Sequence, residues 1–417
     1  MQSVCDQPGG LLTLEQARSQ LLEALKPVQR AIRVPAGEAL GRVLAETLST
    51  PLDFPPFDNS AMDGYAVKAV DAVPGATLRT VGTIRAGEVP EHSVRSGECV
   101  RILTGAPMPQ GADAVVVQER VTIEGALIRL NLSEPLRLGA NIRRQGEELR
   151  RGEILVAQGS VLGPFELGLL AFAGITEVWV ADPLRIGVLA TGDELIPPGE
   201  MLAPGQIHES NRPVLLGLIQ EMGHQAVDLG MVPDAFERLR EALIRGASDV
   251  DALITTGGAS EGDADFVAKA LTELGEVTFW KVAVKPGKPF VFGRLASVPI
   301  FGLPGNPVSS AVIFLKLVKP ALERLSGRRP QRPVTWRLPL QAGVQRQPGR
   351  LEFMRGQLVE TEQGLKVIPL AHQGSHRLTS MTRGDCLIVL PPEILTLNSG
   401  DFVDVELFRP VSWPQET

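Results

Sequence analysis

Aromatic residues are scarce in this chain: they make up 5% of its 417 residues, and Tyr65 is the only tyrosine. Single-stranded nucleic acid is commonly bound by stacking its bases on aromatic side chains, so the composition disfavours that class of protein. Positive charge is also in short supply, because 41 Lys and Arg stand against 48 Asp and Glu. We therefore expect neither a nucleic-acid binder nor a membrane-surface protein, and an anionic ligand must be held by a local cluster of cations.

Cysteine is rare as well, with three residues in the chain. Cys5, Cys99 and Cys386 are far apart and form no C-x-x-C pair, which argues against a disulfide framework and against a cysteine metal site. The sequence also lacks an apolar run of membrane-spanning length, and its start lacks the basic and apolar regions of a signal peptide. These absences predict a cytoplasmic protein without a membrane partner.

The common short motifs of nucleotide-binding enzymes are missing too. The sequence has no G-x-x-x-x-G-K-[ST] P-loop and no G-x-G-x-x-G between a predicted strand and helix. A Walker-type nucleotidase and a dinucleotide-binding oxidoreductase are therefore disfavoured.

The length of the chain predicts several domains, because a single core rarely grows this large. Thr13 and Gln16 have the spacing of a capping box and predict a helix, and a second helix is predicted over residues 37–48. Short β-prone runs separated by turn residues over 77–132 predict a small all-β module. Residues 142–181 return to mixed structure and can pack back on the N-terminal segments, which would make the β module an insertion.

Strands and helices alternate along residues 184–328, which predicts a doubly wound sheet with ligands at the carboxyl ends of its strands. The predicted strands are 186–190, 226–230, 252–255, 277–284 and 290–301, and the predicted helices are 212–222, 235–245, 265–274 and 308–325. The predicted fold class is a multidomain α/β protein with four parts. These are an N-terminal mixed and helical domain (1–53 plus 142–182), an inserted β module (54–141), a doubly wound α/β domain (183–329) and a C-terminal β-barrel domain (330–417).

Two glycine-containing segments follow predicted strands of the α/β domain. Gly302 to Ser309 includes Pro304 and Asn306 and leads into a helix, and Gly257, Gly258 and Ser260 follow an earlier strand. Turns of this kind direct backbone N–H groups and the positive end of a helix dipole at an anion. Taken alone, each segment is equally well explained as a tight strand-to-helix turn.

Charged side chains lie beside these turns. Lysines follow one predicted strand at positions 281, 285 and 288, and carboxylates follow others. Each group has an ordinary explanation, since lysines often protect an exposed strand and an acid near a helix start often caps it. Their convergence on one sheet edge instead predicts phosphoryl or phosphoanhydride chemistry, with phosphate bound by the cations and Mg²⁺ bound by carboxylate oxygens. The groups concerned are Lys281, Lys285, Lys288, Glu194, Asp234 and Asp265.

Two further segments are dense in turn-forming residues and remain ambiguous from their composition. Residues 55–66 contain Asp63 among other carboxylates, and residues 101–109 contain Thr104. Both are compatible with a structural Asx turn or with a functional loop. The basic pair Arg143 and Arg144 can likewise bind phosphate or remain solvated.

In their order along the chain, these segments resemble those of the MoeA family of molybdopterin molybdenumtransferases, to which the gephyrin E domain is related. The resemblance spans essentially the whole length. It rests on five stretches of sequence: FDNSAMDGYA at 57–66, TGAP at 104–107, TGDEL at 191–195, KPGKP at 285–289 and GLPGNPVS at 302–309.

This resemblance implies a Mg²⁺-dependent reaction in which molybdate is inserted into adenylylated molybdopterin and AMP is released. It implies a homodimer, with an active cleft between the α/β domain of one subunit and the β module of the other. It also implies contacts with a molybdopterin adenylyltransferase and with the molybdoenzymes that receive the cofactor.

By matching motif positions, the resemblance assigns roles to individual residues. The positions important for the reaction correspond to Asp63, Thr104, Glu194, Asp234 and Asp265, of which the last three are candidate Mg²⁺ ligands. The oxyanion pocket corresponds to Lys285, Lys288, Ser309, Arg355 and Ser375. Lys281 and Arg143 fall at further substrate-binding positions.

Two positions depart from the family pattern. Glu148 and Glu209 stand where Asp is frequent, and one added methylene moves the charge by roughly 1.5 Å, so neither is assigned to the site. Two other functions stay open. A molybdopterin adenylyltransferase shares the α/β fold but lacks the Asp63 and Thr104 segments, and a non-catalytic scaffold would not need the acidic positions that this sequence retains.

Overall fold

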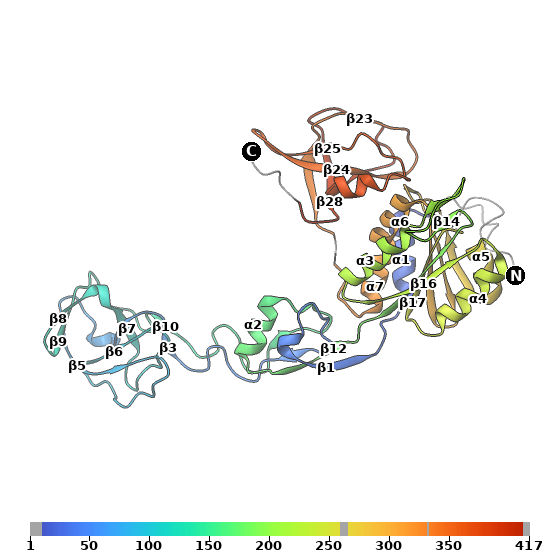
Figure 1. Cartoon of the computed structure of the whole chain (residues 1–417). Helices are drawn as coiled ribbons and strands as arrows, with labels where there is room; N and C mark the ends of the chain where they lie inside the picture. The colour runs from blue at the N-terminus through green and yellow to red at the C-terminus, as the bar shows by residue number, and fades with distance from the viewer. Residues whose placement is uncertain (1–10, 259–265, 332, 412–417) are drawn as a thin grey trace.

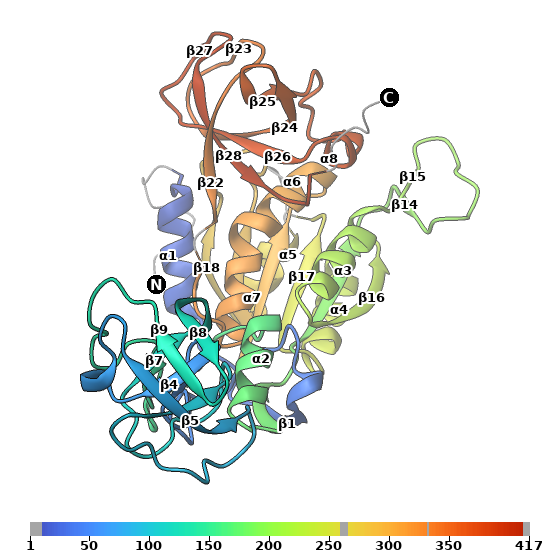
Figure 2. The same ribbon diagram turned by 90° about the vertical axis from the view of Figure 1, so that its left-hand side faces the viewer.

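The computed structural model describes residues 11–258, 266–331 and 333–411. The chain is elongated: a β module lies at one end, an α/β domain lies at the other, and a mixed domain joins them (Figure 1). The C-terminal domain packs beside the α/β domain (Figure 2). Across the described residues, no helix combines the length and apolar character that a membrane span requires.

The β module contains a six-stranded sheet of order β7-β4-β6-β5-β9-β8. The predicted β-prone runs are confirmed as strands. Successive residues enter two cores on opposite faces of the sheet, as Tyr65 and Val67 do on one side and Ala66 does on the other. The strands are β4 (Gly64–Val67), β5 (Thr77–Ile84), β6 (Glu98–Ile102), β7 (Ala114–Val117), β8 (Val121–Glu124) and β9 (Leu127–Leu130).

The mixed domain is assembled from segments on both sides of the β module. β1 (Ala31–Pro35) pairs with β12 (Glu177–Ala181), and β2 (Leu48–Ser49) pairs with β11 (Ile154–Val156), while α2 (Pro164–Phe172) covers them. The chain thus leaves this domain, forms the β module and returns. β3 (Asn59–Ser60) pairs with β10 (Ile142–Arg143) where the two connecting segments run together.

The helix predicted over residues 37–48 is wrong. Only a single 3₁₀ turn forms, Ala36–Glu38, and Val43 and Leu44 then make isolated β-bridges to Val161 and Val180. Gly41 lies in this segment with a φ of 75°, a left-handed conformation that ends any helix. Pairing with distant segments therefore decides the local structure.

The predicted N-terminal helix is confirmed as α1 (Leu14–Ala24). Its capping box is complete, because Thr13 N donates to Gln16 Oε1 at 2.9 Å and Gln16 N donates to Thr13 Oγ1 at 3.2 Å. The apolar face of α1 joins the core of the α/β domain rather than that of the mixed domain with which the predicted boundaries group it. The boundaries themselves stay a prediction.

The α/β domain is built on a six-stranded sheet of order β16-β13-β17-β21-β20-β18, in which β16, β13, β17 and β21 are parallel. Helices cover both faces, because neighbouring strand residues such as Leu253 and Ile254 enter different cores. α3 and α6 pack on one face, and α4 and α5 pack on the other. The bounds are β13 (Arg185–Thr191), α3 (Asn211–Glu221), β16 (Gln225–Val232), α4 (Phe236–Ala247), β17 (Ala252–Thr256), α5 (Phe266–Leu274) and β18 (Glu276–Trp280).

Two predicted elements of this domain differ in detail. The strand predicted over 290–301 is an antiparallel pair, β20 (Val291–Leu295) and β21 (Val298–Leu303), which reverses at Ala296 with a φ of 53°. The helix predicted over 308–325 is interrupted: a π-helical segment (Phe314–Val318) separates α6 (Pro307–Ile313) from α7 (Lys319–Leu325).

The C-terminal domain has a sheet of order β19-β24-β26-β28-β22, with β25 paired to β24. The predicted barrel is not confirmed, because among the described residues the sheet follows an open path, to which Leu340 and Val367 add one isolated bridge. Small elements complete the domain. The bounds are β22 (Thr335–Pro339), β23 (Val344–Gln345), β24 (Leu351–Thr361), β25 (Gly364–Pro369), α8 (Thr379–Arg383), β26 (Cys386–Leu390), β27 (Thr396–Leu397) and β28 (Phe402–Leu407).

The C-terminal domain is firmly joined to the α/β domain. β19 (Val284–Lys285), which follows the α/β strand β18 in the chain, is an edge strand of the C-terminal sheet. Lys316 of the π-helical segment pairs with Glu406 and lies 4.8 Å from the ring centroid of Phe353. Phe353 itself is buried in the α/β core, so the two domains share one hydrophobic cluster.

Candidate functional site

A cavity of about 1090 Å³ lies at the carboxyl ends of β13, β17 and β21, where the α/β domain meets the C-terminal domain. This is the sheet edge at which the alternating pattern of strands and helices predicts a ligand. The loops after the three strands form one side of the cavity, and residues of β24 and of the segment 373–376 form the other. The site therefore has walls from two domains.

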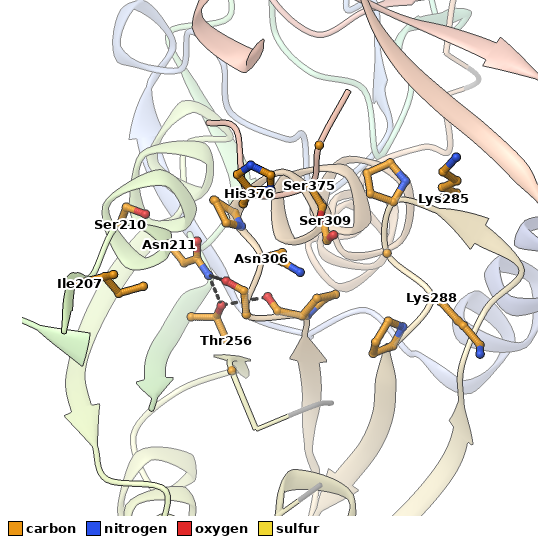
Figure 3. A pocket seen from close by; sticks show the side chains of 18 of the residues that line it. Ile207, Ser210, Asn211, Thr256, Lys285, Lys288, Asn306, Ser309, Ser375 and His376 are labelled. Carbon is orange, nitrogen blue, oxygen red and sulfur yellow. Dashed lines mark hydrogen bonds between the residues drawn. The ribbon is translucent and has the colours of Figure 1, made fainter. Parts of the chain in front are cut away.

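The loop after β21 is held open by the side-chain amide of Asn211. Its Nδ2 donates to Thr256 Oγ1 and to the Gly305 carbonyl, both at 2.7 Å, and Thr256 Oγ1 donates to the Pro304 carbonyl at 3.3 Å (Figure 3). Asn306 then occupies the N-cap position of α6 without a capping hydrogen bond from its side chain, and Pro307 is the first residue of the helix, where a missing N–H costs nothing. These hydrogen bonds join the loop to the start of α3 and to the end of β17.

Two serines lie beside this loop. Ser309 is in the first turn of α6, and the carbonyl of Ser375 accepts a hydrogen bond from Val308 N at 3.0 Å. This contact ties the segment 373–376 of the C-terminal domain to the start of α6. Figure 3 shows the two serines close to each other on the cavity wall. Their hydroxyls can donate hydrogen bonds to an oxyanion.

Gly257, which directly follows β17, lies close to the backbone at the end of β13. Its φ is 86°, and a Cβ at this position would lie 2.0 Å from the Thr191 carbonyl oxygen. Only glycine fits both the conformation and the space. Gly257 lines the cavity, whereas the adjacent Gly258 does not. The close approach brings the residues that follow β13 to the cavity wall.

Cations form the side of the cavity next to the C-terminal domain: Lys285, Lys288, Arg350 and Arg355 all line it. The side chain of Arg355 is almost fully buried, with 1% of the residue exposed. Its guanidinium donates to Ser380 Oγ at 3.0 Å and to the carbonyls of Phe353 and Gly374 at 3.4 and 3.3 Å. Burial lowers its pKa to about 10, an effect that the charge of Glu352 partly opposes.

Arg355 is notable for the charge of its partners. In the described part of the chain, the hydrogen bonds of its guanidinium all go to neutral oxygens, and no carboxylate forms an ion pair with it. Removing a cation from water costs several kcal/mol unless an opposite charge compensates it. A buried guanidinium at a cavity wall is therefore suited to bind an anion from the cavity.

Carboxylates stand on the opposite side, after β13 and β16. Glu194 lines the cavity, and its Oε2 occupies the space where a Cβ on Gly192 would lie, at 2.7 Å from that position. Asp234 accepts a hydrogen bond from Thr191 Oγ1 at 2.7 Å, and Asp193 accepts one from Asp234 N at 3.1 Å. Asp234 and Asp193 are thus held in place by neutral donors, and each has a second carboxylate oxygen.

These oxygens fit the chemistry of Mg²⁺, which prefers hard oxygen ligands and is often held by one or two carboxylates plus substrate phosphates. Among the described residues, no three acidic, histidine or cysteine side chains form a ready metal site. Glu194 and Asp234 therefore suit a cation whose coordination is completed by oxygens of the substrate. Asp265, the third predicted ligand, lies outside the described residues, as does Ser260.

Glu209 also lines the cavity, but its carboxylate is occupied. Oε1 accepts the N–H groups of Asn211 and Arg212 at 2.7 and 2.8 Å, and Oε2 pairs with Arg212 Nε at 3.1 Å. It therefore caps α3, a favourable place for an anion. The exposed side chain of Glu148 lies in the segment that connects the mixed domain to the β module.

The remaining predicted residues of the β module lie far from the cavity within one chain (Figure 1). Asp63 and Thr104 contact each other: Thr104 N and Oγ1 donate to Asp63 Oδ1 at 2.7 and 2.8 Å. The two hydrogen bonds from Thr104 lower the pKa of Asp63. Arg143 lies in β10, in the segment that connects the β module to the mixed domain. One oxygen of Asp63 keeps its acceptor capacity for a ligand or another chain.

Family models match three parts of this sequence. Residues 12–174 match the MoeA N-terminal region (domain I and II), residues 187–324 match a model described as "Probable molybdopterin binding domain", and residues 337–408 match the MoeA C-terminal region (domain IV). A molybdopterin molybdenumtransferase of Haemophilus influenzae is 40% identical over 403 residues, which cover 96% of this chain and 99% of that protein. The chain belongs to the MoeA family.

Other members agree with this placement. A molybdopterin molybdenumtransferase of Synechococcus elongatus is 37% identical over 95% of this chain and 99% of that protein. A crystal structure of the molybdopterin biosynthesis protein moeA from Pyrococcus horikoshii OT3 has a TM-score of 0.82 at 30% identity, and the match covers 96% of this chain and 100% of that one. The multidomain α/β architecture is thus the MoeA fold.

The cavity of this MoeA-family chain brings together many, but not all, of the predicted site residues. Those that line it are Glu194, Gly257, Lys285, Lys288, Pro304, Asn306, Ser309, Arg355 and Ser375. Those described outside it are Asp63, Thr104, Arg143, Asp234, Gly258 and Lys281. Asp234 is one hydrogen bond from the lining residue Thr191. The catalytic and binding roles themselves stay predictions.

Sequence reasoning missed several residues of the wall. Asn211 lies two residues after Glu209, and Thr256 directly precedes Gly257. The hydrogen bond between Asn211 and Thr256 joins segments that are distant in sequence, so no local pattern indicates it. Glu352 lies three residues before Arg355 on β24. No local pattern marks it, because its importance comes from a lysine on another strand.

Proposed function

We propose that this chain is a molybdopterin molybdenumtransferase of molybdenum cofactor biosynthesis, which inserts molybdate into adenylylated molybdopterin in a Mg²⁺-dependent reaction that releases AMP. The observation that carries the proposal is Arg355: a buried guanidinium lines the cavity, donates to neutral oxygens and accompanies two lysines and two serines. Molybdate is a tetrahedral dianion, and charge-assisted hydrogen bonds from such groups suit it. The names of the relatives support the same reaction.

In this proposal, one group of cavity residues binds molybdate and another binds a phosphate of the substrate. Lys285, Lys288 and Arg355 orient the oxyanion, and Ser309 and Ser375 donate hydrogen bonds to its remaining oxygens. The loop fixed by Asn211 presents backbone N–H groups at the start of α6, where a phosphate of the substrate is stabilised by the helix dipole. Binding the two reactants side by side lowers the entropic cost of bringing them together.

Glu194 and Asp234, with Asp265, would hold the Mg²⁺ ion. When bound, this ion supplies charge stabilisation to a phosphoanhydride as AMP departs. Thr191 keeps the carboxylate of Asp234 oriented toward the same end of the sheet, since its hydroxyl donates to Oδ1. The space left by Gly192 lets Glu194 fold back over its own loop.

The proposal includes a homodimer in the cytoplasm. Asp63 and Thr104 sit at the far end of the chain from the cavity, yet they match positions important for the reaction in the family (Figure 1). A second subunit would resolve this separation by bringing its β module to the cavity. Within such a dimer, Asp63 would approach the substrate from the partner. Transfer of substrate from an adenylyltransferase and of product to molybdoenzymes belongs to the same proposal.

One assay tests the function. The purified chain is incubated with adenylylated molybdopterin, Mg²⁺ and molybdate, and AMP release and reconstitution of a cofactor-free molybdoenzyme are measured. We expect both signals to depend on molybdate and on Mg²⁺. Consumption of ATP with free molybdopterin, independent of molybdate, would instead identify an adenylyltransferase, and the absence of either activity would contradict an enzymatic role.

A further inference from the structure

Glu352 is a buried carboxylate on the cationic side of the cavity. Its side chain is 7% exposed, and it lines the same wall as Lys285, Lys288, Arg350 and Arg355. A negative charge at this place opposes the binding of any anion. It also has to be compensated, because a buried carboxylate without a partner is strongly destabilising.

The nearest compensating charge comes from one residue. Lys285 Nζ lies 2.9 Å from Glu352 Oε1, whereas Arg346 Nε lies 3.4 Å from Oε2, and Oε2 makes no hydrogen bond among the described residues. The guanidinium of Arg346 is otherwise engaged, donating to the carbonyls of Leu390 and Arg350 at 2.9 and 2.7 Å. Lys285 is therefore the nearer of the two cations that pair with Glu352.

Backbone pairing brings the two residues together. Lys285 on β19 is directly opposite Glu352 on β24, in the parallel pair that joins the two domains. The lysine side chain is 50% exposed, so without a partner it would move freely in solvent. The carboxylate keeps its ammonium at the cavity wall, on the side where Figure 3 shows Lys285 and Lys288.

We propose that Glu352 is a positioning residue that holds Lys285 at the cavity wall and competes with the oxyanion for its ammonium group. The inference rests on the oxyanion site of the proposed function. A tetrahedral dianion that enters the cavity must pair with the ammonium group of Lys285, which otherwise pairs with the carboxylate of Glu352. The competition weakens ground-state binding of the dianion, which favours turnover because a substrate bound too tightly before the reaction gains nothing in rate.

The test measures oxyanion binding to the full chain, which requires no turnover. Molybdate and, separately, sulfate are titrated calorimetrically into the wild type, Glu352→Gln, and the control Glu360→Gln, which changes an exposed glutamate of the same strand. Glutamine keeps the shape of the side chain and removes its charge. We expect about fivefold tighter binding of molybdate to Glu352→Gln, the size of a partly exposed ion pair, and no change in the control.

A second pair of variants separates competition for Lys285 from a general charge effect. In the Lys285→Met background, molybdate binds weakly, and adding Glu352→Gln should no longer tighten it. A gain that persists without Lys285 would overturn the proposal, as would unchanged or weaker binding by folded Glu352→Gln. If Glu352→Gln does not fold, Glu352→Asp serves instead. The shorter side chain moves the carboxylate away from Lys285 by roughly 1.5 Å, so this variant should also bind molybdate more tightly than the wild type does.

Kinetics adds a readout that a merely structural role would not move. In Glu352→Gln we expect the KM for molybdate to fall about fivefold while kcat does not rise. The two proposals also fail differently. If the wild type binds molybdate but transfers none, the proposed function is wrong while the competition can still be measured; if transfer occurs and Glu352→Gln leaves molybdate binding unchanged, only the competition is wrong.

Discussion

The side-chain amide of Asn211, at the start of α3, donates a hydrogen bond to the carbonyl of Gly305 at 2.7 Å. A second hydrogen bond of the same length joins the amide to Thr256 Oγ1. One buried residue thus fixes the positions of three segments: the start of α3, the end of β17 and the loop before α6. The shape of the cavity depends on this contact as much as on the residues that face a ligand.

Asn211→Ala should therefore loosen the loop. The substitution removes the buried hydrogen bond to Thr256 and the partly buried one to the Gly305 carbonyl, which together cost about 2 kcal/mol of unfolding free energy. We expect molybdate binding to weaken as well, measured by titration beside chemical denaturation. Asn131→Ala is the control, because Asn131 makes one exposed hydrogen bond in the β module. Equal behaviour of the two variants would show that the loop needs no such support.

Arg355→Met should weaken oxyanion binding without unfolding the protein. Methionine fills much of the buried space and removes a charge that is costly to bury, so stability should change little. Loss of charge-assisted hydrogen bonds should weaken molybdate binding by about tenfold to a hundredfold. Arg383→Met, on the exposed end of α8, is the matched control. Wild-type affinity in folded Arg355→Met would remove the main support for the oxyanion site.

Gly257→Ala should damage the site more than its conformation alone explains. Gly257 and Gly75 both have a positive φ, 86° and 74°, but a Cβ meets the Thr191 carbonyl at 2.0 Å in the first case and open space in the second. Gly75→Ala should cost about 1 kcal/mol from strain. Gly257→Ala should cost about 3 kcal/mol or more, because β13 and β17 must separate. Thermal and denaturant unfolding of both variants compare the two costs.

His224 should make stability depend on pH. Burial, helped by the charge of Arg328, lowers its pKa to about 4, and its Nδ1 has no hydrogen-bond partner in the described structure. The unfolded chain, with a pKa near 6.5, binds a proton that the folded chain does not, so unfolding free energy falls as the pH drops from about 6.5 to 4. The loss should approach about 3 kcal/mol.

The matched experiment follows denaturant unfolding across this pH range. His224→Gln should flatten the dependence relative to the wild type, and the exposed His372→Gln should leave it in place. A wild-type slope that survives in His224→Gln would assign the proton to another group.

Mixed dimers test the contribution of the β module. Asp63→Asn and Glu194→Gln should each be inactive in transfer, since they change opposite halves of the proposed composite site. Mixing the two after dissociation should restore about a quarter of wild-type activity, because half of the dimers are mixed and each of these has one intact site. Activity that does not return, in mixtures shown to exchange subunits, would place Asp63 outside the partner's cavity.

Short-range physics let the sequence predict much of the fold. The capping box at Thr13, the alternation of strands and helices over 184–328 and the turn before Pro307 all depend on residues within a few positions of each other. The same reasoning failed at 37–48, where β-bridges to Val161 and Val180 replaced a helix. It also failed at 290–301, where a reversal at Ala296 divides one apolar run into two strands.

By itself, the sequence determined the chemical inventory of this protein: lysines, glycines and carboxylates at the ends of parallel strands, and the family to which their order points. Only the tertiary structure decided which of them meet. It paired Lys285 with Glu352 across two domains, left Arg355 buried with neutral partners, and placed Asp63 at the far end of the chain. The physical reason is that hydrogen bonds and ion pairs act over a few ångströms in space, whatever the separation in sequence.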